Sequence, residues 1–287
     1  ARFGRIEAHE AICAWAREIL LQTIAMAESS GWTVLHAIVD CVWLHREDVS
    51  RQEKQVLAKD FAQRVTQEIG IPLEYEDIYH FIGFLPSRMH GSGSLTKYWA
   101  YGEKGLKIRG VESRQHSTCN WIKTLQDMAL QILVDCVNDG VEIGSKHVQN
   151  IVCNLLHHEL TRLVDYQVAL KDLVVTRRVT KAVEQFTVST LTHSALLRAS
   201  ALGHNIPPGR KVRFIVTKSS SRDSIDRTML LEELDNATNV KIDVQYYREL
   251  AIRAMWAILA PFGWTEDEIR AGSKTVTLFD FNSTMRA

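Results

Sequence analysis

The sequence lacks paired cysteines, long apolar runs and an excess of charge of either sign. Its five cysteines stand far apart and form no C-x-x-C pair, so they give no sign of a disulfide framework, a zinc knuckle or an iron–sulfur site. No apolar run reaches membrane-spanning length, and the first residues, ARFGRIEAHE, lack the apolar core of a signal peptide. We therefore expect reduced thiols, a cytoplasmic location and no membrane partner.

Because its positive and negative charges balance, the protein as a whole does not attract a polyanion. Lys plus Arg number 34 and Asp plus Glu also number 34, so any affinity for nucleic acid must come from local basic patches. The 287 residues, 46% of them hydrophobic, can build one large domain or two ordinary ones around a real core. The first residue is Ala and the chain opens inside what reads as an element, so we expect a piece of a longer protein.

The first part of the chain predicts helices mixed with hairpins. Apolar residues at helical spacing predict a long helix from Glu7 to Ser29. The runs TVLHAI and CVWLH are separated only by Val39 and Asp40, which predicts a hairpin that bends at Asp40. Further expected elements are a helix over 51–67 ended by Gly70, a strand over 79–85, a Gly/Ser loop over 89–94, and a second hairpin that turns at 103–105.

After Ser117 the pattern becomes mainly helical. Helical periodicity covers 121–137, 145–163, 189–202 and 246–260, and LVVTRRVT and KVRFIVT are strand candidates. We place a domain boundary near Arg114 to Ser117, which gives one domain over 1–115 and a second over 116–287. The expected fold class is α+β: a mixed sheet with packed helices, followed by a mainly helical domain with a few strands.

Two apparent catalytic motifs are rejected. His157 and His158 lack the i, i+4 pairing with a nearby acid that a helical zinc site needs, so they are better interpreted as core or solvated histidines. The segment TKSSSRDSIDRT resembles the phosphate loop of cysteine-dependent phosphatases, but Thr217 stands where the thiolate belongs and Arg227 lies too far from it. A solvated charged loop is the better interpretation, and a phosphatase is the least favoured of the functions considered.

Basic residues gather on the predicted strands. Since alternate residues of a strand share one face, Lys107 and Arg109 can meet the phosphates of a backbone lying across a sheet. Tyr98 and Trp99 add an apolar surface that suits a sugar-phosphate edge. An ordinary solvated strand face explains the same spacing equally well. The remaining candidates for DNA contact are Lys97, Arg114, Arg177, Arg178 and Lys181.

Asp40 is the candidate catalytic residue and metal ligand. An ionised carboxylate within an apolar run is costly to bury unless it is paired or meets a metal. At a hairpin tip it can be held rigidly and still reach solvent, as a ligand for a divalent metal must. An ordinary Asp in a turn is the more frequent explanation of such a residue. A two-metal site would need a second acid from elsewhere.

Several segments in this order resemble the C-terminal part of family B DNA polymerases, particularly archaeal ones. ARFGRIEAHEAICAWAREIL resembles the helix after the fingers motif, and VLHAIVDCVWL falls where the palm hairpin carries an Asp-Thr-Asp-Ser signature. LTKYWA resembles the Lys-Lys-Tyr strand, and KIRGVESRQHST resembles the segment that leads into the thumb. Three later segments, VVTRRVTKAVEQF, HSALLRASALGHNIPPGRKVRFIVT and DVQYYRELAIRAMWAILAPFGW, resemble parts of the thumb.

The resemblance implies a palm over 1–115 and a thumb over 116–287. Asp40 would be the second aspartate of the signature, a ligand of Mg²⁺ in a two-metal site completed by residues outside this chain. Lys97, Tyr98, Arg109 and Arg114 would grip the primer-template, and Arg177, Arg178 and Lys181 would follow the duplex. The implied partners are primer-template DNA, deoxynucleotide triphosphates, an N-terminal polymerase part, fused or separate, and a sliding clamp. A nucleoid-associated location follows from the same resemblance.

The sequence departs from the family pattern at the signature itself. Ile38 stands where the first aspartate belongs, Val39 replaces the threonine and Cys41 replaces the serine. Gln115 and Ser117 replace the second arginine and the aspartate of the segment before the thumb. The palm motif with the other essential aspartate, the fingers and the exonuclease domain are absent from this sequence. We therefore expect the chain alone to be inactive, and a catalytically inactive paralogue that binds DNA or assists assembly remains the alternative.

Overall fold

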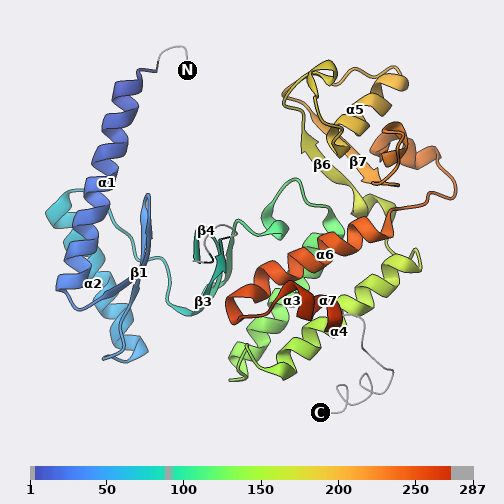
Figure 1. The fold of residues 1–287 in the computed structure, drawn as a ribbon. Helices are drawn as coiled ribbons and strands as arrows, with labels where there is room; N and C mark the ends of the chain where they lie inside the picture. Colours follow the sequence, from blue (N-terminus) through green and yellow to red (C-terminus); the bar gives the residue numbers. More distant parts are fainter. Residues whose placement is uncertain (1–3, 88–90, 92, 273–287) are drawn as a thin grey trace. The chain divides into compact units, whose positions relative to one another are not determined.

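The computed structural model describes residues 4–87, 91 and 93–272, and it divides into two compact units. Unit 1 comprises residues 1–82 and 100–107, and unit 2 comprises residues 83–99 and 108–287. Helices and short sheets make up both, so the predicted α+β class is confirmed (Figure 1). These units are defined by internal contacts, and the division into palm and thumb near residue 115 stays a prediction.

Unit 1 begins with two helices and a hairpin. Its elements are α1 (Ile6–Ser29), β1 (Thr33–Ile38), β2 (Cys41–His45) and α2 (Arg51–Ile69), close to their predicted bounds. Ala27, Trp32, Phe61 and Val65 form a buried cluster that joins the end of α1 to the middle of α2. A capping box starts α2, because the Ser50 hydroxyl accepts from the Glu53 amide and the Glu53 carboxylate accepts from the Ser50 amide.

A three-stranded sheet has the order β3-β4-β5, and each of its strands has residues in both units. The strands are β3 (Tyr79–Pro86), β4 (Gly93–Gly102) and β5 (Gly105–Arg109), so the predicted second hairpin is confirmed. Asp77 fixes the turn between β4 and β5, because its carboxylate accepts from the Lys104 amide at 3.1 Å. Of the predicted Gly/Ser loop over 89–94, residues 89, 90 and 92 lie outside the described residues.

Four helices of unit 2 pack together: α3 (Asn120–Asn138), α4 (Lys146–Val164), α6 (Val244–Leu259) and α7 (Glu266–Gly272) (Figure 1). The buried amide of Gln126 joins two of them to the preceding segment, since it accepts from the Ser113 amide at 2.7 Å and donates to the Ala254 carbonyl oxygen at 2.7 Å. Helix α7 was not predicted. Within the described residues, no helix has both the length and the apolar content that crossing a bilayer requires.

The remaining elements of unit 2 are β6 (Val175–Arg178), α5 (Leu191–Ala201), β7 (Lys211–Val216) and β8 (Thr228–Leu230). The strands form an antiparallel sheet in the order β6-β7-β8. Tyr247 of α6 links the helices to this sheet, because its buried hydroxyl accepts from the Val216 amide and donates to the Leu173 carbonyl oxygen, both at 2.9 Å. Strand β8 was not predicted, since three residues are too short for an alternating pattern.

Candidate functional site

The hairpin of β1 and β2 presents Asp40 at its tip, as predicted. Ile38 pairs with Cys41, which leaves Val39 and Asp40 as the two turn residues. Val39 has a φ of 50°, a conformation that is costly for a β-branched residue, and both turn side chains are exposed. The turn therefore fixes the backbone of Asp40 while its carboxylate remains open to solvent.

The surroundings of this turn contain one half-buried thiol and one fixed cation. Burial raises the pKa of the Cys41 thiol, and the negative charge of Asp40 raises this pKa further. Lys107 of β5 opposes the effect: its ammonium lies 5.3 Å from the ring centre of Trp43 and 5.9 Å from that of Tyr79. The ammonium also donates to both carboxylate oxygens of Glu76, at 2.5 and 2.6 Å. Lys107 is thus half-buried and already paired.

The acids around Asp40 do not form a metal centre. Among the described residues, no group of three or more His, Cys, Asp or Glu side chains is arranged to hold a metal ion. Magnesium takes near-octahedral oxygen coordination and is usually held by one or two carboxylates together with substrate phosphates and water. The donor set that this chain offers at the turn is the single carboxylate of Asp40, which does not suffice for a two-metal site. The role of Asp40 as a metal ligand therefore stays a prediction.

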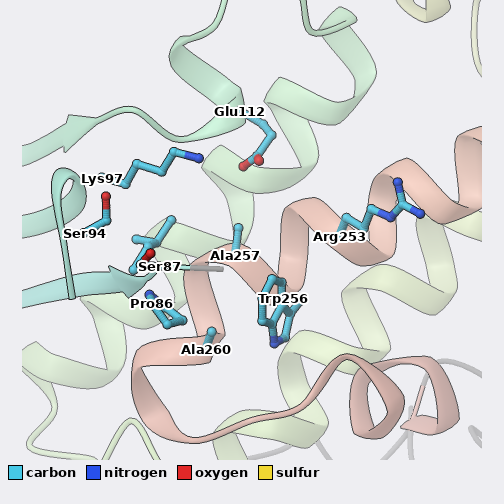
Figure 2. Close-up of a pocket in the computed structure, with 10 residues that line it drawn as sticks. Pro86, Ser87, Ser94, Lys97, Glu112, Arg253, Trp256, Ala257 and Ala260 are labelled. Carbon is cyan, nitrogen blue, oxygen red and sulfur yellow. The ribbon is translucent and has the colours of Figure 1, made fainter. Parts of the chain in front are cut away.

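Lys97 lines a pocket of about 300 Å³ in unit 2. Figure 2 shows the ends of the Lys97 and Glu112 side chains extending toward one another, with Trp256 and Ala257 of α6 on the other side of the pocket. Gly110 allows the close packing behind Lys97, because a Cβ atom there would lie 2.8 Å from Lys97 Cγ and would overlap the carbonyl oxygen of Thr96. Lys97 itself is exposed, as a phosphate contact requires.

The other predicted contacts of this region differ in exposure. Arg109 and Arg114 are exposed, whereas Tyr98 is only 4% exposed and its ring centre lies 5.7 Å from that of Phe84. Trp99 is fully buried, with its indole nitrogen donating to the Ile258 carbonyl oxygen at 3.3 Å. The two aromatic side chains therefore pack inside unit 2, and a DNA contact by Tyr98 stays a prediction.

The three basic residues predicted on and after β6 face different surroundings. Arg177 is half-buried and donates to the Ser117 carbonyl oxygen at 2.8 Å. Arg178 is exposed and pairs in register with Lys211. Lys181 lies over the ring of Phe186, with its ammonium 4.8 Å from the ring centre. Arg178 is thus the one of the three with the greatest freedom to contact a ligand, and the DNA contacts of all three stay predictions.

A basic cleft on β6 and β7 was missed by the sequence analysis. It has a volume of about 540 Å³ and is lined by His116, Thr176, Gly209, Arg210, Lys211 and Arg213. A signal was present in KVRFIVT, where the basic residues Lys211 and Arg213 alternate with the apolar residues Val212 and Phe214. That alternation indicates one buried and one solvated face, which the structure confirms.

A family model described as DNA polymerase family B matches residues 10–262. The chain belongs to this family. Similar proteins include DNA polymerases of Thermococcus kodakarensis, 25% identical over 94% of this chain and 15% of the relative, and of Archaeoglobus fulgidus, 23% identical over 96% and 34%. The family B DNA polymerase of Pyrobaculum calidifontis has a similar fold, with a TM-score of 0.57 and 21% identity over 90% of this chain and 30% of that one.

The family resemblance stated from the sequence is therefore confirmed. The chain spans about a third or less of the length of these curated relatives. Family B DNA polymerases use divalent metals in general, and the described residues of this chain contain no complete site for them. The activity, substrates and partners of the whole enzyme are accordingly proposals for this chain.

Proposed function

We propose that this chain is the C-terminal palm and thumb portion of a family B DNA-directed DNA polymerase. Combined with the N-terminal palm and fingers, it would take part in template-directed nucleotidyl transfer, in which a primer 3′-hydroxyl attacks the α-phosphate of a deoxynucleotide triphosphate. In this proposal Asp40 belongs to the catalytic turn, and the chain alone is inactive. Its cellular role is DNA replication or repair in the cytoplasm, in association with the nucleoid.

The observation that carries the proposal is the extent of the family match together with the position of Asp40. The match covers residues 10–262 and so includes both the hairpin and the helices α3, α4 and α6 of unit 2. The hairpin turn holds an exposed carboxylate, and the sequence resemblance matches this turn to the catalytic signature of the family. Lys97, Arg109, Arg114 and Arg178 are exposed and can bind the primer-template through its phosphates, independently of sequence.

The proposed partners follow from this assignment. Primer-template DNA and deoxynucleotide triphosphates are the substrates, and the N-terminal polymerase part supplies the acids that Asp40 lacks. A sliding clamp is the further partner proposed for the assembled enzyme. Mg²⁺ would be held jointly by Asp40 and by acids outside this chain.

A second candidate function is supported by Ile38. This residue pairs with Cys41 at the base of the turn, and its side chain has no atom that can coordinate a metal. If the assembled protein needs an acid at this position, the chain belongs to a catalytically inactive paralogue that binds DNA or assists assembly. The two candidates agree on DNA binding and differ only in nucleotidyl transfer.

Primer extension by the chain together with its N-terminal polymerase part separates the two candidates. We expect extension with a divalent cation present, and a loss of at least about a hundredfold in rate for Asp40→Asn. Asp60→Asn is the matched control, because Asp60 is an exposed acid of unit 1 on α2, away from the turn. Absence of extension from an assembly that binds primer-template would contradict the enzyme and favour the inactive paralogue.

A further inference from the structure

Within the part of the chain that the structure describes, the hairpin that carries Asp40 pairs with no further strand. β1 and β2 form a two-stranded sheet of their own, and β3, β4 and β5 form a separate one. An isolated two-stranded hairpin is marginally stable in water and needs packing against other elements. Helix α1 supplies part of this packing, because it lies against β1. The position of the Asp40 turn relative to the three-stranded sheet therefore depends on side-chain contacts.

Trp43 of β2 makes such a contact with the three-stranded sheet. Alternate residues of a strand share one face, so Trp43 lies on the same face of β2 as Cys41, the residue next to Asp40. Trp43 is buried, and its ring centre lies 4.4 Å from that of Tyr79, the first residue of β3. Aromatic pairs of about this spacing stabilise a contact beyond the area that they bury. This ring pair therefore joins the hairpin to the first strand of the sheet.

Lys107 of β5 ties the last strand of the sheet to the same ring pair. Its ammonium lies 5.3 Å from the ring centre of Trp43 and 5.9 Å from that of Tyr79, and it donates to both carboxylate oxygens of Glu76. The Lys107 side chain is only 22% exposed, and a partly desolvated ammonium interacts more strongly with aromatic rings than an exposed one does. We define the Lys107 clamp as Trp43, Glu76, Tyr79 and Lys107, all within unit 1.

The charges of the Lys107 clamp act on the catalytic turn. Burial has the largest effect on the pKa of the Cys41 thiol and raises it, and the negative charge of Asp40 raises it further. Lys107 lowers this pKa and Glu76 raises it. Charges shift a pKa in this way only when they lie near the titrating group. The ion pair of the clamp is therefore close to the turn that Cys41 ends.

We propose that the Lys107 clamp holds the hairpin against the three-stranded sheet and so positions the Asp40 carboxylate. In this proposal Lys107 is a positioning residue, which acts on the reaction through the turn. The inference rests on the proposed function, because the carboxylate that is positioned is the one proposed for nucleotidyl transfer. A phosphate contact by Lys107 would exchange the Glu76 carboxylate and release the clamp, so the two roles are alternatives for this side chain.

The opposite charges of Lys107 and Glu76 make the two roles separable. Lys107→Met removes a positive charge and Glu76→Gln removes a negative one, so a direct phosphate contact predicts opposite effects of the two variants. A clamp predicts the same effect, because each variant removes one partner of its ion pair. We expect each to lower the rate of primer extension on the order of tenfold at saturating primer-template and nucleotide. The double variant should lose no more than either single one.

A conservative variant and a matched control accompany these measurements. Lys107→Arg should keep the extension rate, because a guanidinium can stack on aromatic rings and bind both oxygens of a carboxylate. Lys59→Met is the control: Lys59 is exposed on α2 in the same unit, and its ammonium lies 5.5 Å from the ring centre of Tyr75. It removes the same charge and a contact of the same kind, and we expect the extension rate to change less than about twofold.

Hydrogen exchange of the full chain by itself gives a readout that does not depend on activity. We expect Lys107→Met to speed the exchange of amides in 33–45 at least about threefold, because the hairpin loses a contact with the sheet. Exchange in α3, which lies in unit 2, should stay unchanged and so exclude a general loss of stability. Lys59→Met should leave the exchange of 33–45 as in the wild type.

The outcomes distinguish this inference from the function on which it rests. If the wild-type assembly extends a primer, opposite effects of Lys107→Met and Glu76→Gln would make Lys107 a DNA contact and overturn the inference alone. Unchanged exchange of 33–45 in Lys107→Met would likewise overturn it and leave the proposed function intact. Absence of extension from a wild-type assembly that binds primer-template would overturn both the function and the positioning of Asp40 for it.

Discussion

At the scale of single residues, neighbouring side chains decide whether a charged group is free to contact a ligand. Asp40 is exposed at a turn that Val39 holds in a costly conformation, whereas Lys107 of β5 is already bound to Glu76. Lys107 therefore has to exchange this carboxylate for a phosphate before it can contact DNA. This partly exposed pair contributes about 1 kcal/mol or less, so a phosphate contact can offset its loss.

Replacing Glu76 by Gln tests whether Lys107 contacts DNA. Removing the carboxylate frees the ammonium, so we expect Glu76→Gln to raise the affinity for a primer-template duplex about two- to fivefold. Glu74→Gln is the control, because Glu74 is an exposed acid two residues away in the same segment. An equal rise for both variants would indicate a general effect of net charge and would contradict a specific role of Lys107. Fluorescence anisotropy at several salt concentrations measures both.

The sequence predicted where single residues lie on the elements, but it did not predict which side chains surround them. The hairpin and the place of Asp40 could be predicted, because two β-branched runs separated by two residues leave few alternatives. The burial of Tyr98 and Trp99 could not be predicted, since Tyr98 lies against Phe84 and Trp99 donates to the carbonyl oxygen of Ile258, which is far away in the sequence. The pairing of Lys107 with Glu76 likewise joins segments that no local pattern connects.

At the scale of elements, the approach of β5 to β4 depends on Gly110. This residue follows β5 with a φ of 69°, and its Cα faces the backbone of Thr96 and the side chain of Lys97. A larger residue would therefore strain the backbone and also push against the strand that carries Lys97. The position of Lys97 on β4 therefore depends on the glycine that directly follows β5.

Substitution of Gly110 by Ala separates these two effects when it is compared with Gly140→Ala. Gly140 also has a φ of 69°, but a Cβ atom there would meet nothing within 4 Å. We expect Gly140→Ala to lower the free energy of unfolding by about 1 kcal/mol, from the backbone conformation alone. Gly110→Ala should lower it by at least about 2 kcal/mol, because the overlap is added. Urea unfolding measures both, and equal losses would contradict the close packing.

Elements were predicted best where a periodic pattern was long. The helices α1, α2, α3, α4 and α6 begin and end within a few residues of the predicted bounds, because each contains several turns of apolar spacing. Strand β8 and helix α7, with three and seven residues, were missed, since they are held by tertiary contacts rather than by their own pattern. The basic cleft was missed for a related reason: Thr176 and Arg213 become neighbours only through strand pairing.

At the scale of the whole molecule, the two tasks proposed for this chain, catalysis and DNA binding, are assigned to different parts of its fold. The hairpin of unit 1 carries the carboxylate proposed for the catalytic turn, and unit 2 carries the exposed cations of the pocket region and of the basic cleft. The net charge of zero means that these local groups, rather than the overall field, must select a polyanion. In the proposed function, the catalytic task further depends on acids from outside this chain.

Site-specific photocrosslinking of a primer-template to the chain, assembled with its N-terminal part, tests this division of tasks most directly. One probe stands at the primer 3′ end, and a second stands further back in the duplex. The account predicts that the first probe crosslinks to the peptide that contains Asp40 and the second to the peptide of 175–178. Crosslinks from the primer end that avoid the Asp40 hairpin, or that fall on the same peptide as those of the second probe, would contradict it.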